Sequence, residues 1–150
     1  MTTPIRETAL AAIVARLAAQ IPTATVERAR RAPVDVEKET LPRLVVTGID
    51  WTADETAEPG ITHYTLDFTV QGYAKARTDL ATEQALGTLL ASTVAALAGW
   101  TPTESGLGEP AEAGAELGLY DAEDSAKPAG EFTARFSMLC LAALGSPYSP

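Results

Sequence analysis

The stretch that decides the fold is HYTLDFTV, residues 63–70, in which polar and apolar side chains alternate without a break. Its apolar members are Tyr64, Leu66, Phe68 and Val70. A period of two is typical of a β-strand that has one face in the core and one face among polar surroundings. The sequence therefore predicts a sheet with one buried face.

The segment before this strand is expected to pair with it. Residues 44–49 are rich in aliphatic and β-branched side chains and predict a strand that Trp51 closes. An acidic loop, residues 52–60, separates the two strands, so we expect a long β-hairpin with this loop at its tip. A short strand or an extended arm is expected at residues 25–27.

Two further strands are expected near the end of the chain. Residues 131–142 alternate, with Phe132 and the other even-numbered side chains on the buried face. The second face turns apolar at Leu139 and Leu141, as if another surface covers that end. A short strand is also predicted at residues 117–120.

Two helices complete the predicted fold. Apolar side chains recur at helical spacing over residues 4–20, and Thr3 is expected to be the N-cap. A second helix is expected to begin at Thr78 or Asp79 and to end near Gly99. Together these elements predict an α+β fold, a mixed or antiparallel sheet of about four strands packed against two helices.

Length and composition exclude several classes of protein. The 150 residues predict one domain, residues 1–150, with a flexible tail at 145–150. A net charge of −9 argues against a protein whose main task is to bind nucleic acid, because phosphate contacts need a basic face. The one cysteine, Cys140, excludes an internal disulfide. No signal peptide is apparent, which predicts a cytoplasmic site of synthesis.

The negative charge is concentrated in two segments. Residues 48–60 carry a charge of −4 and residues 101–126 carry −7, whereas the rest of the chain carries +2. Both segments are also rich in Gly, Pro, Thr and Ser, and they are therefore expected to be loops. Residues 84–100, in the second helix, carry no charge at all. Either a second subunit covers this helix or its Ala, Thr and Ser side chains form a plain solvated face; a membrane span is disfavoured because the run is short and polar.

No catalytic motif stands out. His63 is the only histidine and is expected to be an ordinary strand residue, and Cys140 is expected to be a small buried side chain. Asp121, Glu123 and Asp124 could hold a hard cation, but the spacing of an EF-hand loop is missing. The basic residues Arg28, Arg30 and Arg31 could bind phosphate or an acidic protein, or could form ion pairs with Asp35, Glu37 or Glu39.

The order of the expected elements is similar to that of the tail terminator family of long-tailed phages and related particles, whose fold resembles the phage lambda terminator. Three stretches carry the likeness: residues 30–48, residues 63–97 and residues 118–138. The resemblance implies a non-enzymatic α+β subunit without cofactors. It also implies a hexameric ring that caps the tail tube, stops its growth and docks the head side. The long acidic loops depart from the family pattern.

The resemblance further implies where the protein acts and what it touches. It predicts a virion protein of the tail or neck, made in the host bacterial cytoplasm, whose partners are its own copies, the tail tube protein and a head-completion or neck protein. DNA would pass through the ring without specific binding, and no membrane would be involved. A head–tail connector and a small acidic enzyme or metal-binding protein are the alternatives. The residues expected at interfaces are Trp51, Asp54, Glu55, Glu58, Trp100, Tyr120, Arg28, Arg30, Arg31, Leu139 and Leu141.

Overall fold

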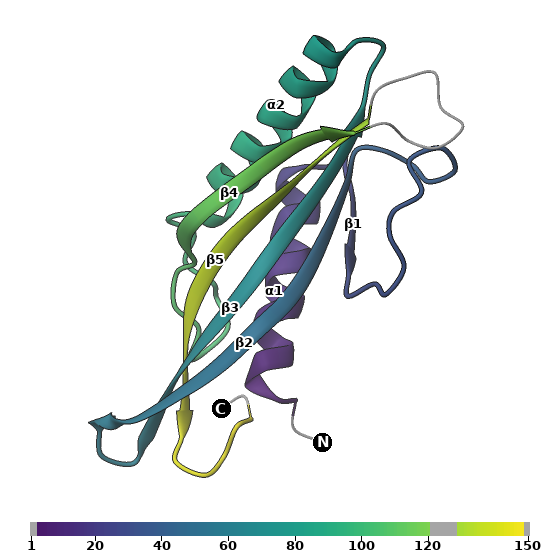
Figure 1. Ribbon diagram of the computed structural model, residues 1–150. Coiled ribbons are helices and arrows are strands. Elements are labelled where there is room, and N and C mark those ends of the chain that lie inside the picture. Colours follow the sequence, from purple (N-terminus) through teal and green to yellow (C-terminus); the bar gives the residue numbers. More distant parts are fainter. Residues whose placement is uncertain (1–2, 121–128, 149–150) are drawn as a thin grey trace.

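The computed structural model describes residues 3–120 and 129–148, apart from the side chains of residues 55–57. The elements are two helices and five strands, arranged as an α+β fold (Figure 1). Their bounds are α1 (Ile5–Gln20), β1 (Thr25–Arg28), β2 (Arg43–Glu58), β3 (Ile61–Lys75), α2 (Asp79–Leu97), β4 (Ala111–Tyr120) and β5 (Ala129–Ala143).

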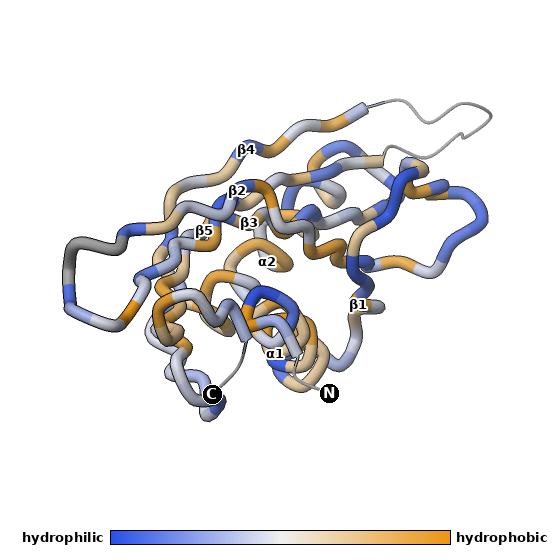
Figure 2. Tube along the Cα trace, turned by 90° about the horizontal axis from the view of Figure 1, so that it is seen from below, coloured by the Kyte–Doolittle hydropathy of each residue, from blue (hydrophilic) through white to orange (hydrophobic). Residues whose placement is uncertain are grey.

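The strands form one sheet in the order β1-β2-β3-β5-β4. β1 pairs with β2 in parallel, and every other pair is antiparallel. The predicted α+β class with a mixed sheet and two helices is confirmed, with one strand more than the four expected. Both helices lie on the same side of the sheet, which leaves the other side, called here the open face, without a helix (Figure 2).

The acidic segment after Trp51 is a strand and not the predicted loop. β2 continues to Glu58, and Thr52 and Asp54 lie opposite Thr65 and His63 of β3. The turn is confined to the residues between β2 and β3, where Gly60 has a φ of 78°. Pairing with the antiparallel strand β3 thus outweighs the low strand propensity of this acidic segment.

The second acidic segment also contains more strand than predicted. β4 runs from Ala111 to Tyr120, whereas only residues 117–120 were expected to be a strand. It pairs with β5 along this length, with an irregular register between Glu112 and Gly114, whose φ is 121°. This segment forms a strand because it pairs with the edge of β5. β5 is distant in sequence, so the residues of the segment themselves give no indication of the pairing.

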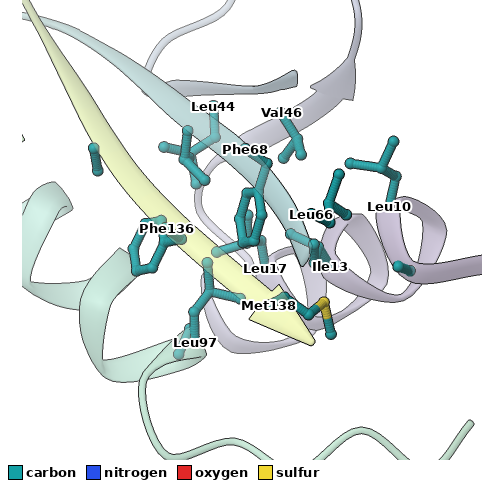
Figure 3. Packing of buried hydrophobic residues seen from close by; sticks show 14 of the residues in the cluster. Leu10, Ile13, Leu17, Leu44, Val46, Leu66, Phe68, Leu97, Phe136 and Met138 are labelled. Carbon is teal, nitrogen blue, oxygen red and sulfur yellow. The ribbon is translucent and has the colours of Figure 1, made fainter. Parts of the chain in front are cut away.

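The main core lies between the sheet and the two helices. The even-numbered side chains of β3 and β5 point toward the helices, as their alternation predicts, and Phe68 and Phe136 stack with centroids 5.4 Å apart. α1 contributes one apolar stripe through Leu10, Ile13 and Leu17, each at most 1% exposed. Figure 3 shows these side chains converging between the layers.

A second, smaller cluster lies on the open face at the end of the sheet near β1. Val34 and Val36 of the β1–β2 connection cover Val45 and Tyr73 there, together with Ala129. This cluster explains why the connection, although acidic and proline-bracketed in sequence, is held against the sheet.

The helix starts differ in how they are capped. Thr78 caps α2 as predicted, because its Oγ1 accepts a hydrogen bond of 3.1 Å from the backbone N–H of Ala81. The prediction that Thr3 caps α1 is wrong, since Pro4 occupies that position without a side-chain cap. The backbone N–H of Ile5 instead donates to the carbonyl oxygen of Pro147 at 2.9 Å, so residues near the C-terminus close this helix end.

α2 is long and apolar enough to cross a membrane by length and composition alone. One of its faces packs on the sheet, through side chains that include Leu86, Leu89 and Leu97. The buried hydroxyl groups of Thr82 and Thr93 donate to main-chain carbonyl oxygens four residues earlier, at 2.9 and 2.8 Å. About 33% of the apolar stretch of α2 is buried, and the alternatives of a covering second subunit or a plain solvated face for the rest of the helix stay predictions.

Candidate functional site

The β2–β3 hairpin carries the first acidic segment beyond the ends of both helices (Figure 1). Asp54 lies opposite His63, and the pairing continues to Glu58. Trp51 stacks on Tyr64 with 4.5 Å between the ring centroids and 14° between the ring planes, and both rings pack against the main core. The stack packs the base of the projection against the core, and the register becomes irregular between Asp54 and Glu58 toward the tip.

Among the residues expected at interfaces, those of the hairpin divide into two kinds. Trp51 is half-buried and occupied by its contact with Tyr64, whereas Asp54 and Glu58 are exposed. The side chain of Glu55 lies outside the described part of the structure. Their contact with a partner stays a prediction.

His63 and Cys140 cannot act together. His63 lies opposite Leu141 on the open face, and its buried Nε2 has no hydrogen-bond partner among the described residues. The nearest carboxylate oxygen, Oε1 of Glu58, is 3.6 Å away, too far for a hydrogen bond. Cys140 belongs to the core on the other face, where burial raises the pKa of its thiol to about 12. A protonated, buried thiol is a poor nucleophile.

The arginine residues at the β1 side of the sheet are mostly engaged within the chain. Arg28 pairs with Glu7 at 2.6 Å, and Arg30 pairs with Glu27 at 2.7 Å and with Glu39 at 2.6 Å. The hydrogen bond from Arg28 lowers the pKa of Glu7, and the one from Arg30 lowers the pKa of Glu39. The predicted pairing with Glu39 is therefore present, and it ties the β1–β2 connection to the sheet.

Two basic side chains of this connection remain exposed. Arg31 and Lys38 form no ion pair within the described residues, in contrast to Arg43, which reaches Glu27 at 2.8 Å. Residues 25–43 contain five basic and four acidic side chains. After the internal pairs are formed, the outward charge of this side of the sheet is positive. Of the three predicted basic contact residues, only Arg31 is free to meet a partner without breaking an existing pair.

Two aromatic residues expected at interfaces have contacts inside the chain. Trp100 packs against the main core, and the guanidinium carbon of Arg16 lies 5.7 Å from its ring centroid. Arg16 is itself held by a hydrogen bond of 2.9 Å to the carbonyl oxygen of Ala96. Tyr120 packs against the small cluster that contains Tyr73, and burial raises the pKa of its hydroxyl. Both residues therefore stabilise the packing of the chain itself, and their role in contacts with partners stays a prediction.

The far end of β5 is covered in part by the chain itself. The backbone N–H of Gly108 donates to Leu139 at 2.8 Å, and the N–H of Leu141 donates to Gly106 at 2.7 Å. Leu139 nevertheless remains 41% exposed on the open face. The loop before β4 thus supplies backbone partners for this end, while the apolar side chain of Leu139 still lacks a cover within the described residues.

Sequence reasoning missed the edge formed by β4. This strand is last in the sheet, most of its residues are exposed, and Leu117 and Leu119 are 46% and 42% exposed. A groove of about 410 Å³ separates it from α2 and is lined by small and aliphatic side chains, Leu90 and Val94 among them, and by the charged Glu112. The absence of charge in residues 84–100 was the signal, and it pointed to the helix side of this groove.

The structure offers few polar groups for chemistry. A second groove, of about 430 Å³, lies between α2 and the β1–β2 connection, but its one charged group, Lys75, is already paired with Glu37. Within residues 3–120 and 129–148, no group of three or more acidic, histidine or cysteine side chains is placed to hold a metal ion. The candidate cation ligands Asp121, Glu123 and Asp124 lie outside the described residues.

Comparisons with known proteins add no family to these observations. No protein-family model matches the sequence, and no curated protein is similar to it. The candidate site is therefore chosen from the structure and not from a relative. It consists of three surfaces: the acidic hairpin tip, the exposed β4 edge with its groove, and the arginine-rich side of β1.

Proposed function

We propose that this chain is the ring-forming tail terminator of a phage-type particle, a structural protein without catalytic activity. The observation that carries the proposal is the pair of unlike, unpaired edges of one sheet. Within the described residues no strand covers β4, whose side is acidic, or β1, whose side is arginine-rich. A subunit of a closed ring needs two different contact surfaces, one for each neighbour.

The projecting hairpin supports the same function. A tube-capping ring needs contacts along its axis in addition to those between its subunits. The tip with Asp54 and Glu58 stands beyond both helices, and the Trp51–Tyr64 stack holds its base (Figure 1). Such a projecting hairpin suits docking to a neighbouring ring of tube protein or to the head side.

The charge distribution supports a channel through which DNA moves without binding. The charges of −4 in residues 48–60 and −7 in residues 101–126 would repel phosphate where these segments face the lumen. The three stretches that resemble the tail terminator family, residues 30–48, 63–97 and 118–138, provide independent support, because that family forms hexameric rings. Assembly would take place in the host cytoplasm, with the tail or neck of the virion as the destination.

The test is the assembly state of the full chain, alone and on purified tail tubes. Sedimentation velocity should find a discrete oligomer of about six subunits in solution or after mixing with tubes, and electron cryomicroscopy should place it on the last ring of tube protein. A chain that stays monomeric at high concentration and does not attach to tubes would refute the proposal. A ring found against the portal instead would assign the head–tail connector role.

The metal-binding alternative has its own test. Calcium or magnesium titrated into the full chain by calorimetry should give no saturable heat if the acidic segments serve assembly. A saturable heat that disappears in a variant with Asp121→Ala and Asp124→Ala would favour the alternative. These two residues lie outside the described structure, so the measurement does not depend on any geometry assigned to them.

A further inference from the structure

The outer edge of β4 is an unpaired backbone edge, because no strand within the described residues lies beyond it. The strand has ten residues, which corresponds to roughly 33 Å of unpaired edge. Exposed edges of this length usually attract another strand unless side chains protect them. β4 has two such protections, the irregular register at Gly114 and the carboxylates of Glu112 and Glu116. It contains no Lys and no Pro.

Apolar surface accompanies this edge on the helix side. Leu117 and Leu119 point toward the helix layer, opposite Phe132 and Gly130, and remain close to half exposed. Nearer the start of β4, a groove bordered by Glu112 and Ala115 runs along α2 over side chains such as Leu90. An edge strand bordered by an apolar groove can be covered by one partner that supplies both backbone groups and apolar side chains.

Charge selects among the partners that the same chain could supply. Residues 101–120 contain four acidic and no basic side chains, and Arg135 of the neighbouring strand β5 reaches Glu116 at 3.2 Å. Glu112 has no ion pair within the described residues. An edge-to-edge contact between two β4 strands would therefore bring carboxylates together. The acidic hairpin tip, with Asp54 and Glu58, would be repelled in the same way.

The arginine-rich side of β1 carries the opposite charge, since residues 25–43 have one more basic than acidic side chain. β1 is the other terminal strand of the sheet, and Arg31, three residues after its end, is exposed and unpaired among the described residues. Lys38 of the same connection is also exposed. We propose that the β4 edge and its groove bind the β1 side of a second copy of this chain, head to tail, so that Glu112 faces Arg31 of the neighbour.

This contact is heterologous, because two different surfaces meet, and a heterologous contact that closes on itself produces a ring. The inference rests on the proposed ring and adds which surfaces form it. Polar groups steer the two edges together and fix their register, while Leu117, Leu119 and the groove supply the apolar area that a stable interface needs.

Two charge reversals, one on each side of the proposed contact, test it. Glu112→Lys places a cation against Arg31 of the neighbour, and Arg31→Glu places a carboxylate against Glu112. Each variant alone should raise the protein concentration needed for half assembly by at least about tenfold, measured by sedimentation velocity of the full chain in solution or on tubes. Asp50→Lys makes the same change of net charge as Glu112→Lys at an exposed position of the open face. It is the matched control for that variant and should assemble like the wild type.

The decisive sample is an equal mixture of Glu112→Lys and Arg31→Glu chains. In a head-to-tail ring the two variants can alternate, so every contact again joins opposite charges. The mixture should recover wild-type assembly, and affinity tags on the two chains should be found in equal numbers in each ring. Circular dichroism and thermal unfolding of each variant show that a lost ring is not a lost fold.

Three outcomes would overturn the inference, and they separate it from the proposed function. A wild-type ring that Glu112→Lys and Arg31→Glu leave as stable as Asp50→Lys does would mean that the ring uses other surfaces. Recovery of Glu112→Lys by mixing with wild type, but not with Arg31→Glu, would indicate a symmetric β4–β4 contact. A wild-type chain that forms no oligomer in solution or on tubes would refute the inference and the proposed function together.

Discussion

A methyl group added at position 72 should destabilise the fold for one identifiable reason. Gly72 lies directly opposite Phe132 on the neighbouring strand, and the ring of Phe132 covers the position where a side chain would be. A Cβ built there would lie 2.2 Å from Cε1 and 2.3 Å from Cζ of the ring. Carbon atoms in good contact are about 3.5–4.0 Å apart. In the Gly72→Ala variant the ring of Phe132 must therefore shift by more than about 1 Å.

The size of the effect follows from the confinement of that ring. Phe132 is 1% exposed and belongs to the main core, where there is little room for it to move. Overpacking of this kind costs about 1–3 kcal/mol of unfolding free energy. For a chain of this length each kcal/mol corresponds to about 2–4 °C, so the melting temperature of Gly72→Ala should fall by about 2–12 °C.

Urea and thermal unfolding at one fixed protein concentration measure this difference, because subunit association would otherwise shift the apparent stability. Gly118→Ala is the matched control: nothing lies within 4 Å of its added Cβ, and its stability should stay within about 0.5 kcal/mol of the wild type. Phe132→Leu combined with Gly72→Ala should cost at least about 1 kcal/mol less than the sum of the two single changes. A Gly72→Ala chain as stable as the control would refute the placement of the ring.

Three further predictions concern capping and ionisation. Thr78→Ala should cost about 1 kcal/mol in urea unfolding, because the N–H of Ala81 loses its acceptor, whereas Thr78→Ser should retain most of the stability. Burial raises the pKa of Cys140 to about 12, so its stabilising contribution is complete below the unfolded-state pKa and is lost as the pH rises toward the folded-state value. Unfolding measured at about pH 8 and about pH 10 should therefore show a smaller decline for Cys140→Ala than for the wild type, and equal declines would contradict a buried thiol. The hydrogen bond from Arg28 holds the pKa of Glu7 below its usual range, so its stabilising effect is lost as the pH falls through the lowered pKa. Arg28→Ala should raise the pKa of Glu7 in an NMR titration, and an unchanged value would exclude the pair.

The parts of the fold that the sequence predicts well are those governed by local pattern. The alternation of Leu66, Phe68 and Val70 identified the buried face of β3, and the periodicity of α1 identified its core stripe. The cap of α2 was narrowed to Thr78 or Asp79, and the structure selects Thr78, because an N-cap acts on a donor only a few residues away. Each of these features is decided within one turn or one strand, where propensity and periodicity carry the information.

The errors concern segments whose structure depends on a distant partner. The acidic residues after Trp51 have poor strand propensity, yet their backbone groups are satisfied by the first residues of β3. Residues 111–114 likewise join the sheet because they pair with β5. The N-terminus of α1 is capped by a hydrogen bond from the N–H of Ile5 to the carbonyl oxygen of Pro147, near the other end of the chain. No local pattern reports the presence of such a partner, so sequence reasoning placed loops and a threonine cap there.

The candidate site was predicted unevenly for a related reason. Composition revealed that the charge is segregated and that one helix has a charge-free stretch. It could not reveal that Arg28 and Arg30 already form ion pairs within the chain, with Glu7, Glu27 and Glu39. Nor could it reveal the exposed edge next to that helix face. Burial and pairing are properties of the assembled sheet, and they decide which charged residues are free to meet a partner.

The segregated charge has a structural consequence once the free surfaces are known. Unpaired strand edges favour any contact with another edge, and apolar patches such as Leu117 and Leu119 strengthen that tendency. Carboxylates at both the hairpin tip and the β4 edge make contacts between equivalent surfaces of two copies unfavourable. A contact of the β4 edge with the β1 side of a neighbour avoids this repulsion, because Arg31 is positively charged. Under the proposed head-to-tail contact, the net charge of −9 would therefore act chiefly by excluding incorrect pairings. It follows that raising the salt concentration should weaken the discrimination between correct and incorrect contacts more than it weakens the apolar attraction itself.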